Sequence, residues 1–269
     1  MAKSLKMKIA VLGATGQTGQ YLVNQALQQG HTVTAIVRNP GKLSLHHDNL
    51  KKPQTFNIRM VEADIFSADS LKTHFKGQDV IMSCLGFPVS FLSAVTGYTL
   101  SMNSVISAMR ESGVNRIITM SSWFTEPNSG GQAPYFIRFL LLPMIRGVLN
   151  NMHEMEKLLE KSEDINWTVV RPPGLKNLPA SAQEFLTHEG YFVPNGGGNA
   201  MGRGDVARFM LSLLNSNAWV KKGVAIIAGS LWAMISDTVV AVTLCCRQKL
   251  KASWFSSSVG SPLSSKTHC

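Results

Sequence analysis

Three glycines near the start of the chain, Gly13, Gly16 and Gly19, have a spacing that lets the backbone hold a phosphate group. Residues 9–12 before them form a short apolar run, typical of a buried strand, and residues 17–29 after them carry apolar side chains at helical spacing. Gly13 would permit a tight turn, Gly16 would let a pyrophosphate approach the backbone, and Gly19 would let the helix pack closely. The helix start offers free N–H groups to the phosphates. This stretch therefore predicts a dinucleotide-binding turn, with a purely structural turn as the alternative.

A basic residue, Arg38, directly follows the second predicted strand, which covers residues 31–37. In dinucleotide-binding folds, an acidic residue about 20 positions beyond the glycines binds the ribose hydroxyls of NAD, whereas a basic residue there accommodates the 2′-phosphate of NADP. No acidic residue lies near Arg38 in the sequence. We therefore expect NADPH to be favoured over NADH; the alternative is that Arg38 merely faces solvent.

The glycine spacing, GATGQTG at residues 13–19, resembles the extended and atypical branches of the short-chain dehydrogenase/reductase superfamily. Three later stretches narrow the resemblance to one group of this superfamily. They are residues 153–159, the sequence WTVVRPPGL at 167–175 and the sequence GRGDVA at 202–207. Together they look like the NmrA-like and biliverdin-reductase-B/flavin-reductase group, over about residues 7–229. The group's known activities imply NADPH-dependent reduction of flavins or linear tetrapyrroles, while some NmrA-like relatives bind dinucleotide without turnover.

The resemblance also implies contacts at the two ends of the cofactor. Asp64 would receive the adenine amino group, together with the Ile65 backbone. The alternative for Asp64 is a helix-entry cap, a role that Ser67 or Asp69 would serve better. The two prolines of the late strand carry the chain past the nicotinamide in this group, so Pro172 to Leu175 should touch it.

The predicted strand at residues 79–86 ends in glycine. Because the crevice of a parallel sheet opens at the strand ends, Ser83 to Gly86 should line the ribose and nicotinamide end of the cofactor. Cys84 within this segment is more typical of a small core residue than of a reactive thiol. The expected cofactor contacts are Gly13, Thr15, Gly16, Gln17, Thr18, Gly19, Arg38, Asp64, Ile65, Ser83, Leu85, Gly86, Ser121, Pro172, Gly174 and Leu175.

Many members of the superfamily transfer a proton through a tyrosine and a lysine four residues later, and this chain lacks that pair. Its tyrosines are Tyr21, Tyr98, Tyr135 and Tyr191, and the residues four positions further on are Gln25, Met102, Phe139 and Asn195. Carbonyl reduction with tyrosine as the acid is therefore not supported. Either the acceptor takes its proton from solvent, as a flavin or another conjugated acceptor can, or there is no chemistry.

Two polar side chains are candidates for contact with a substrate. Ser122 follows the predicted strand at 115–120, where a hydroxyl would position a substrate carbonyl or hydroxyl, with Ser121 as the second choice. A structural serine turn is the alternative. His153 is a candidate proton donor or substrate ligand, and an exposed histidine in the first turn of a helix is the plainer interpretation.

Residues 134–149 are unusually apolar for a connection, and Pro143 interrupts them. We interpret the segment as a lid or wall over an apolar substrate pocket; the second interpretation is an interaction surface for a partner or a membrane. The next helix should be capped by Asn150 or Asn151. Further along, residues 191–194 are predicted as an outer strand.

The composition excludes several classes of partner. The net charge is +10, but lysine and arginine are scattered, so we expect no nucleic-acid partner. The four cysteines show no metal spacing and no disulfide framework, which favours a reducing compartment, with the cytoplasm as the default. The adjacent His46, His47 and Asp48 would point apart and have no evident third ligand, so we predict no metal site.

The last forty or so residues fit nothing in the family. Residues 224–246 are mostly apolar and flanked by basic residues, but Asp237 and the use of 224–228 as a strand argue against membrane insertion. We therefore expect no membrane insertion, and a monomer. Residues 1–229 are predicted as one NAD(P)-binding domain and residues 230–269 as a divergent, disordered tail.

Taken together, the sequence predicts a single α/β domain with a doubly wound, Rossmann-like parallel sheet. The favoured function is an NADPH-dependent oxidoreductase that transfers a hydride to a flavin-like or other conjugated, apolar small molecule. The rival hypothesis is a non-catalytic NADP(H)-sensing protein whose apolar segment at 134–149 docks a partner.

Overall fold

The computed structural model describes residues 5–39, 57–89, 94–194 and 198–229. Its centre is an eight-stranded sheet with the order β3-β2-β1-β4-β5-β6-β10-β8, in which only β10 and β8 pair antiparallel. The strands of this sheet are β1 Lys8–Leu12, β2 Thr32–Val37, β3 Ile58–Glu62, β4 Val80–Ser83, β5 Arg116–Met120, β6 Asn166–Arg171, β8 Phe185–His188 and β10 Lys222–Ala228. A separate parallel pair joins β7 Gly174–Lys176 and β9 Ala200–Gly202.

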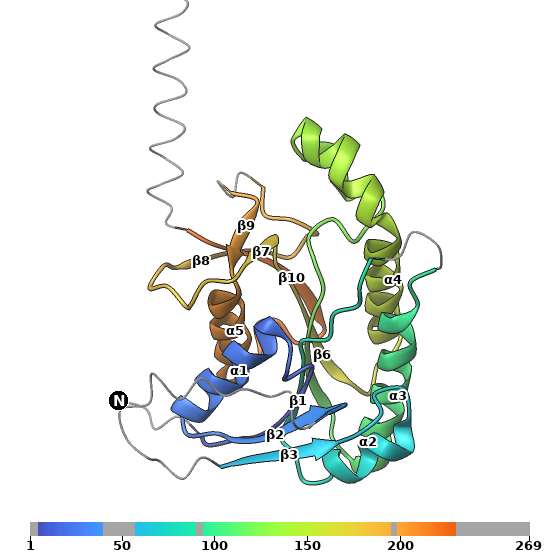
Figure 1. Cartoon of the computed structure of the whole chain (residues 1–269), viewed down its shortest axis with the longest axis vertical. Helices are drawn as coiled ribbons and strands as arrows, with labels where there is room; N and C mark the ends of the chain where they lie inside the picture. The colour runs from blue at the N-terminus through green and yellow to red at the C-terminus, as the bar shows by residue number, and fades with distance from the viewer. Residues whose placement is uncertain (1–4, 40–56, 90–93, 195–197, 230–269) are drawn as a thin grey trace, which may run out of the picture.

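Helices cover both faces of the sheet, because its central strands are apolar on both sides (Figure 1). Ile9 and Val11 of β1 belong to one core, while Ala10 and Leu12 belong to the other. α1 Gln17–Gln28 and α5 Arg203–Ser212 build the first core, and α2 Ala68–Phe75, α3 Gly97–Ser112 and α4 Leu142–Glu160 build the second. The predicted doubly wound α/β architecture is confirmed.

The order of the strands reverses at β1, which pairs with β2 on one side and with β4 on the other. α1 follows β1 onto one face of the sheet, and α3, the next helix after β4, lies on the opposite face. The carboxyl ends of β1 and β4 therefore flank the place where ligands of such sheets bind.

The prediction that Asn150 or Asn151 caps the start of a helix is wrong. Helix runs without a break through both asparagines, and a π-helical turn, Ile137–Leu141, precedes Pro143. The ring of a proline inside a regular α-helix clashes with the carbonyl four residues earlier, and the wider π-helical turn makes room for it. Asn151 is buried instead, and its Oδ1 accepts a hydrogen bond from the Tyr98 N–H at 2.9 Å, which ties α4 to the start of α3.

The predicted outer strand at 191–194 is also wrong. The antiparallel edge strand is β8, Phe185–His188, and the segment after it returns toward β5, where the Tyr191 carbonyl accepts a hydrogen bond from the Phe124 N–H at 2.9 Å. The prediction that Gly113 ends α3 is confirmed by its left-handed φ of 74°.

Several predictions fall outside the described residues, including those for His46–Asp48 and for the tail at 230–269, so the boundary at 229 stays a prediction. Among the helices within the described ranges, none combines the length and apolarity that a bilayer crossing requires.

Candidate functional site

The glycine turn between β1 and α1 is a close-packed backbone junction. Gly13 has a left-handed φ of 75°, and a Cβ there would lie 2.8 Å from the carbonyl carbon and oxygen of Cys84. A Cβ on Gly19 would lie 2.1 Å from the Gly13 oxygen, so the turn and the helix can pack this way only with glycine at both positions. Gly16 is the N-cap of α1 and supplies no side-chain hydrogen bond to it, and the first turn has no acidic residue. The helix start therefore suits an anionic ligand.

A pocket of about 230 Å³ opens beside this turn, at the carboxyl ends of β1, β2 and β4. It has an apolar wall from Ile36, Val37, Ile65 and Phe87 and a cation, Arg38, at the end of β2. A phosphate-binding turn, an apolar wall and a cation together fit a nucleotide cofactor. Seven of the predicted cofactor contacts line this pocket: Gly13, Thr15, Gly16, Arg38, Ile65, Leu85 and Gly86.

The other predicted contacts lie outside the lining of this pocket. The Asp64 side chain is exposed, and its Oδ1 accepts a hydrogen bond from the Phe66 N–H at 3.0 Å, while Ser67 provides the N-cap of α2, as expected. Ser83 is buried at the end of β4. Gln17, Thr18 and Gly19 belong to the first turn of α1, Ser121 follows β5, and Pro172, Gly174 and Leu175 follow β6.

The lining also includes residues that sequence reasoning missed, namely Ile36, Val37, Phe87 and Pro88. Ile36 and Val37 are the last two residues of β2, directly before Arg38, so the position of Arg38 could have indicated them. Phe87 depends on a glycine, because a Cβ on Gly97 would lie 2.5 Å from its ring. Cys84 is buried, and burial raises the pKa of its thiol to about 12, which agrees with the expectation of an unreactive core cysteine.

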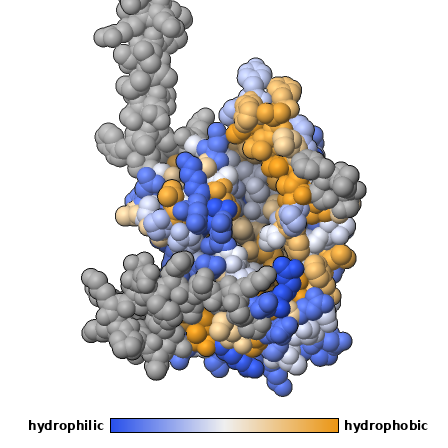
Figure 2. Space-filling model, viewed as in Figure 1, coloured by the Kyte–Doolittle hydropathy of each residue, from blue (hydrophilic) through white to orange (hydrophobic). Residues whose placement is uncertain are grey.

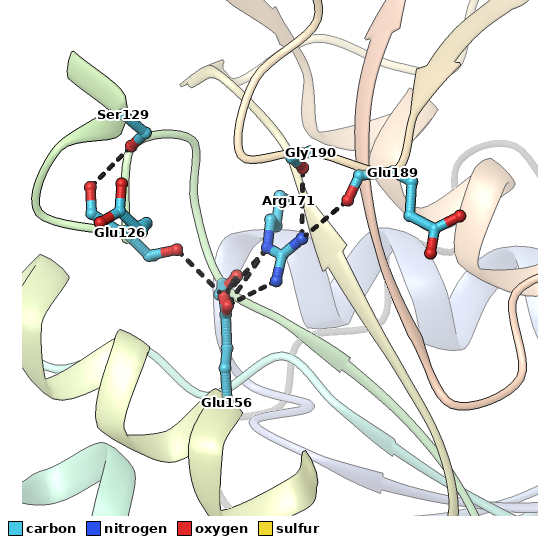
Figure 3. Close-up of polar contacts among 8 residues, drawn as sticks. Glu126, Ser129, Glu156, Arg171, Glu189 and Gly190 are labelled. Carbon is cyan, nitrogen blue, oxygen red and sulfur yellow. Dashed lines mark hydrogen bonds and ion pairs between the residues drawn. The ribbon is translucent and has the colours of Figure 1, made fainter. Parts of the chain in front are cut away.

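A buried ion pair lies on the other side of β5. Glu156 of α4 and Arg171 of β6 are 1% and 4% exposed, and their closest atoms, Oε2 and Nη2, are 2.7 Å apart (Figure 3). Ser121 Oγ donates a hydrogen bond to Glu156 Oε1 at 2.6 Å, and Thr125 Oγ1 donates to the same atom at 3.2 Å. The pair therefore fixes the segment that follows β5.

Arg171 extends the same network to a third segment. Its Nη1 donates to the carbonyls of Glu189 and Gly190, as Figure 3 shows, and its guanidinium carbon lies 4.1 Å from the centre of the Tyr191 ring. Gly223 gives the guanidinium room, because a Cβ there would lie 2.2 Å from Nη1. One buried ion pair and its hydrogen bonds thus hold four segments together: α4, β6, the segment after β5 and residues 189–191.

The two candidate catalytic residues flank this cluster. Ser122 is half-buried and directly follows Ser121, while His153 lies on α4 three residues before Glu156, and so on the same side of the helix. The His153 ring packs edge-on against Tyr191, with centroids 5.9 Å apart. His153 Nδ1 is buried and has no hydrogen-bond partner among the described residues. The expectation of a first-turn, exposed histidine is therefore wrong, because α4 begins at Leu142 and His153 is half-buried.

A second pocket, of about 360 Å³, lies beside β6 and β10. Its lining carries three acidic residues, Glu160, Glu163 and Glu189, and two lysines, Lys221 and Lys222. Lys222 Nζ already lies 2.8 Å from Glu189 Oε2. With this mixture of charges and no glycine turn, it does not suit a dinucleotide.

Comparison with known proteins decides the family. The model of the NAD(P)H-binding family matches residues 13–217, which include the glycine turn, both partners of the buried ion pair and α5. The chain belongs to the NAD(P)H-binding family. The match begins at Gly13, the first glycine of the turn.

Several known proteins are similar to the chain over part of its length. It is 29% identical over 192 residues to an uncharacterized chloroplastic protein of Arabidopsis thaliana, covering 68% of this chain and 64% of that protein. It is 35% identical over 88 residues to an isoflavone reductase homolog of Zea mays, covering 31% of this chain and 27% of that protein. The chain thus spans less than two thirds of these relatives.

Solved structures show the same fold. A Rossmann-fold NAD(P)-binding family protein from Shigella flexneri has a TM-score of 0.60 at 21% identity, covering 84% of this chain and 95% of that one. A Streptococcus pneumoniae protein described as a proposed NADH-flavin reductase has a TM-score of 0.59 at 19% identity, covering 83% and 100%. The predicted Rossmann-like fold and nicotinamide cofactor class are confirmed.

The first test concerns the backbone contact at Gly13. Gly77 has almost the same left-handed φ, 76°, but nothing lies within 4 Å of a Cβ there. Gly77→Ala should lower the free energy of unfolding by about 1–2 kcal/mol, the cost of the left-handed backbone alone. Gly13→Ala should lower it by about 1–3 kcal/mol more, because its Cβ meets Cys84. Urea unfolding measures both, and equal losses would show that the close approach is absent.

The second test concerns the buried ion pair. Glu156→Gln preserves size but leaves the Arg171 guanidinium buried without a counter-charge, so the free energy of unfolding should fall by about 3–5 kcal/mol. Glu156→Gln combined with Arg171→Met removes both charges and should recover most of this loss. Asp164→Asn, which breaks the exposed pair with Arg110, is the control and should change stability little. A Glu156→Gln variant as stable as the parent would contradict the account.

Proposed function

We propose that the protein is an NADPH-dependent oxidoreductase that transfers a hydride to a flavin-like or other conjugated, apolar acceptor. The observation that carries the proposal is the pocket that combines the glycine turn, the open start of α1 and the cation Arg38. Bound NADPH would supply the hydride. The family match supports a nicotinamide cofactor, and Arg38 is the reason for choosing NADPH.

Each group in the pocket has a distinct part in binding. The backbone around Gly13 and Gly16 and the first turn of α1 would hold the diphosphate, and Arg38 would hold the 2′-phosphate. Ile65 would pack on the adenine, with the exposed Asp64 carboxylate beside it as an acceptor for the amino group. Leu85 and Gly86 would lie along the ribose toward the nicotinamide.

Proton delivery must differ from that of reductases with a tyrosine and lysine pair, which this chain lacks. We propose that Ser122 orients the acceptor and that His153 gives it a proton. The buried Nδ1 of His153 has no partner among the described residues, so no observed hydrogen bond commits the ring to a structural role.

The proposed class of acceptor rests on similarity to named reductases and on the lack of the tyrosine and lysine pair. One structural neighbour is described as a proposed NADH-flavin reductase, and one relative is named as an isoflavone reductase homolog. Both names refer to molecules with conjugated rings, a flavin and an isoflavone. We also propose the cytoplasm as the site of action, because the four cysteines show no disulfide framework and so suit a reducing compartment. The relatives include chloroplastic and mitochondrial proteins.

A second candidate function is a non-catalytic NADP(H) sensor. The exposed apolar side chains between residues 135 and 144 favour it, because a surface of this kind suits a docking partner. The two candidates share the cofactor pocket and differ only in turnover.

Steady-state oxidation of NADPH with a panel of flavins, quinones and linear tetrapyrroles separates the two functions. We expect turnover with at least one of these acceptors. His153→Gln should lower kcat about tenfold or more, because it removes the proposed proton donor. Asn103→Ala, at an exposed position of α3, is a control that should leave kcat unchanged. Tight NADPH binding without turnover on any acceptor would favour the sensor.

The choice of NADPH over NADH is tested at Arg38. Arg38→Asp removes a cation and adds a negative charge, so NADPH affinity should fall by about 10- to 100-fold or more, while NADH affinity should change less than about threefold. Arg59→Asp makes the same change of charge on β3, outside the pocket lining, and should affect neither. Isothermal titration measures all four affinities, and equal losses for the two cofactors would refute the assignment.

A further inference from the structure

A helical segment between Pro134 and Ile145 exposes an apolar surface that the proposed function does not use. Tyr135, Phe136 and Phe139 are 82%, 68% and 65% exposed, although side chains of this size are usually half or more buried. Leu140, Leu141 and Met144 continue the surface along the segment. Figure 2 shows the resulting hydrophobic area at one end of the molecule. We refer to these six side chains as the apolar arm.

The arm projects from the body of the fold, as Figure 1 shows for the helix that leads into α4. One side of this helix is covered, because Ile137, Leu142 and Ile145 pack on the core built around Trp123 and Phe124. The other side carries the exposed aromatics, with the rings of Tyr135 and Phe139 stacked at 6.0 Å. Neither of the two pockets described above is lined by the arm, so the predicted lid over a substrate pocket gains no support there.

The charge around the arm is one-sided. No aspartate or glutamate occurs between Pro127 and His153, whereas this stretch contains Arg138 and Arg146. Arg138 is exposed, and its guanidinium lies 5.2 Å from the centre of the Phe139 ring, at the edge of the arm. The whole chain carries a net charge of +10. An occupant that covers the arm must therefore be apolar where it meets the aromatics and negative where it meets Arg138.

A second copy of the chain does not meet this requirement. Two arms packed on each other would bring Arg138 of each copy to the same interface, with no acidic residue from either stretch to balance them. The surface of a bilayer with anionic lipids does meet it. Aromatic and leucine side chains enter the boundary between headgroups and acyl chains, and an arginine at the same level pairs with lipid phosphates.

We propose that the apolar arm binds the surface of an anionic lipid bilayer, with its aromatic side chains in the interface and Arg138 at the phosphates. In this contact the arm lies along the membrane surface and does not cross the bilayer. It differs from the insertion of residues 224–246 that the sequence argued against. It is also independent of the proposed redox function, because neither NADPH nor an acceptor takes part.

Flotation of the full chain with lipid vesicles tests the proposal. We expect binding to phosphatidylcholine vesicles that contain phosphatidylserine, weaker binding to phosphatidylcholine alone, and a decrease with added salt. Phe136→Ser combined with Phe139→Ser should lower the ratio of bound to free protein about tenfold or more, since two aromatic side chains that would enter the lipid interface are lost. The net charge of the chain does not change, so this loss reports the apolar contact alone.

Leu100→Ser combined with Leu178→Ser is the matched control. Both leucines are about half exposed and lie on α3 and after β7, away from the arm, so the same removal of apolar surface should leave vesicle binding unchanged. Retained binding in the Phe136 and Phe139 variant would overturn the proposal, as would failure of the parent chain to bind anionic vesicles at low salt. Light scattering supplies a further outcome. If the parent chain is a dimer and the Phe136 and Phe139 variant is a monomer, the arm mediates self-association, which would also overturn the proposal.

Discussion

The close backbone approach at Gly13 is the constraint on which the cofactor site depends. β1 and β4 are neighbours in the sheet, so the chain leaving β1 must turn directly against the carbonyl of Cys84. Only a residue without a side chain and with a left-handed φ fits there. Gly19 must also lack a side chain, because a Cβ there would meet the Gly13 oxygen. Once both contacts are made, α1 begins at the mouth of the pocket with its N–H groups directed to where a diphosphate would lie.

The buried pair of Glu156 and Arg171 has the corresponding role on the far side of β5. A charge pair at this depth is costly to desolvate, and its partners must be placed well for it to be tolerated. Here Ser121, Thr125 and the carbonyls of Glu189 and Gly190 satisfy the remaining hydrogen bonds. The cluster thereby holds the segment with Ser122 and the helix with His153 in fixed relation to each other.

The sequence predicts the fold well where local and global signals agree. The apolar strands, the glycine turn and Gly113 at the end of α3 all follow from backbone chemistry that a few neighbouring residues decide. It fails where distant residues decide. Asn151 resembles a helix cap, but its partner is the start of α3, and Pro143 is tolerated because a π turn precedes it. Glu156 and Arg171 are fifteen residues apart, and only packing of α4 on β6 reveals them as partners.

The central claim is that the glycine turn binds the diphosphate of a nicotinamide cofactor, and a crystal structure grown with saturating NADPH tests it most directly. We expect the diphosphate within hydrogen-bond distance of the N–H groups from Gly16 into the first turn of α1, with the 2′-phosphate beside Arg38. A nucleotide bound elsewhere on the molecule, or a pocket that stays closed to it under these conditions, would contradict the account.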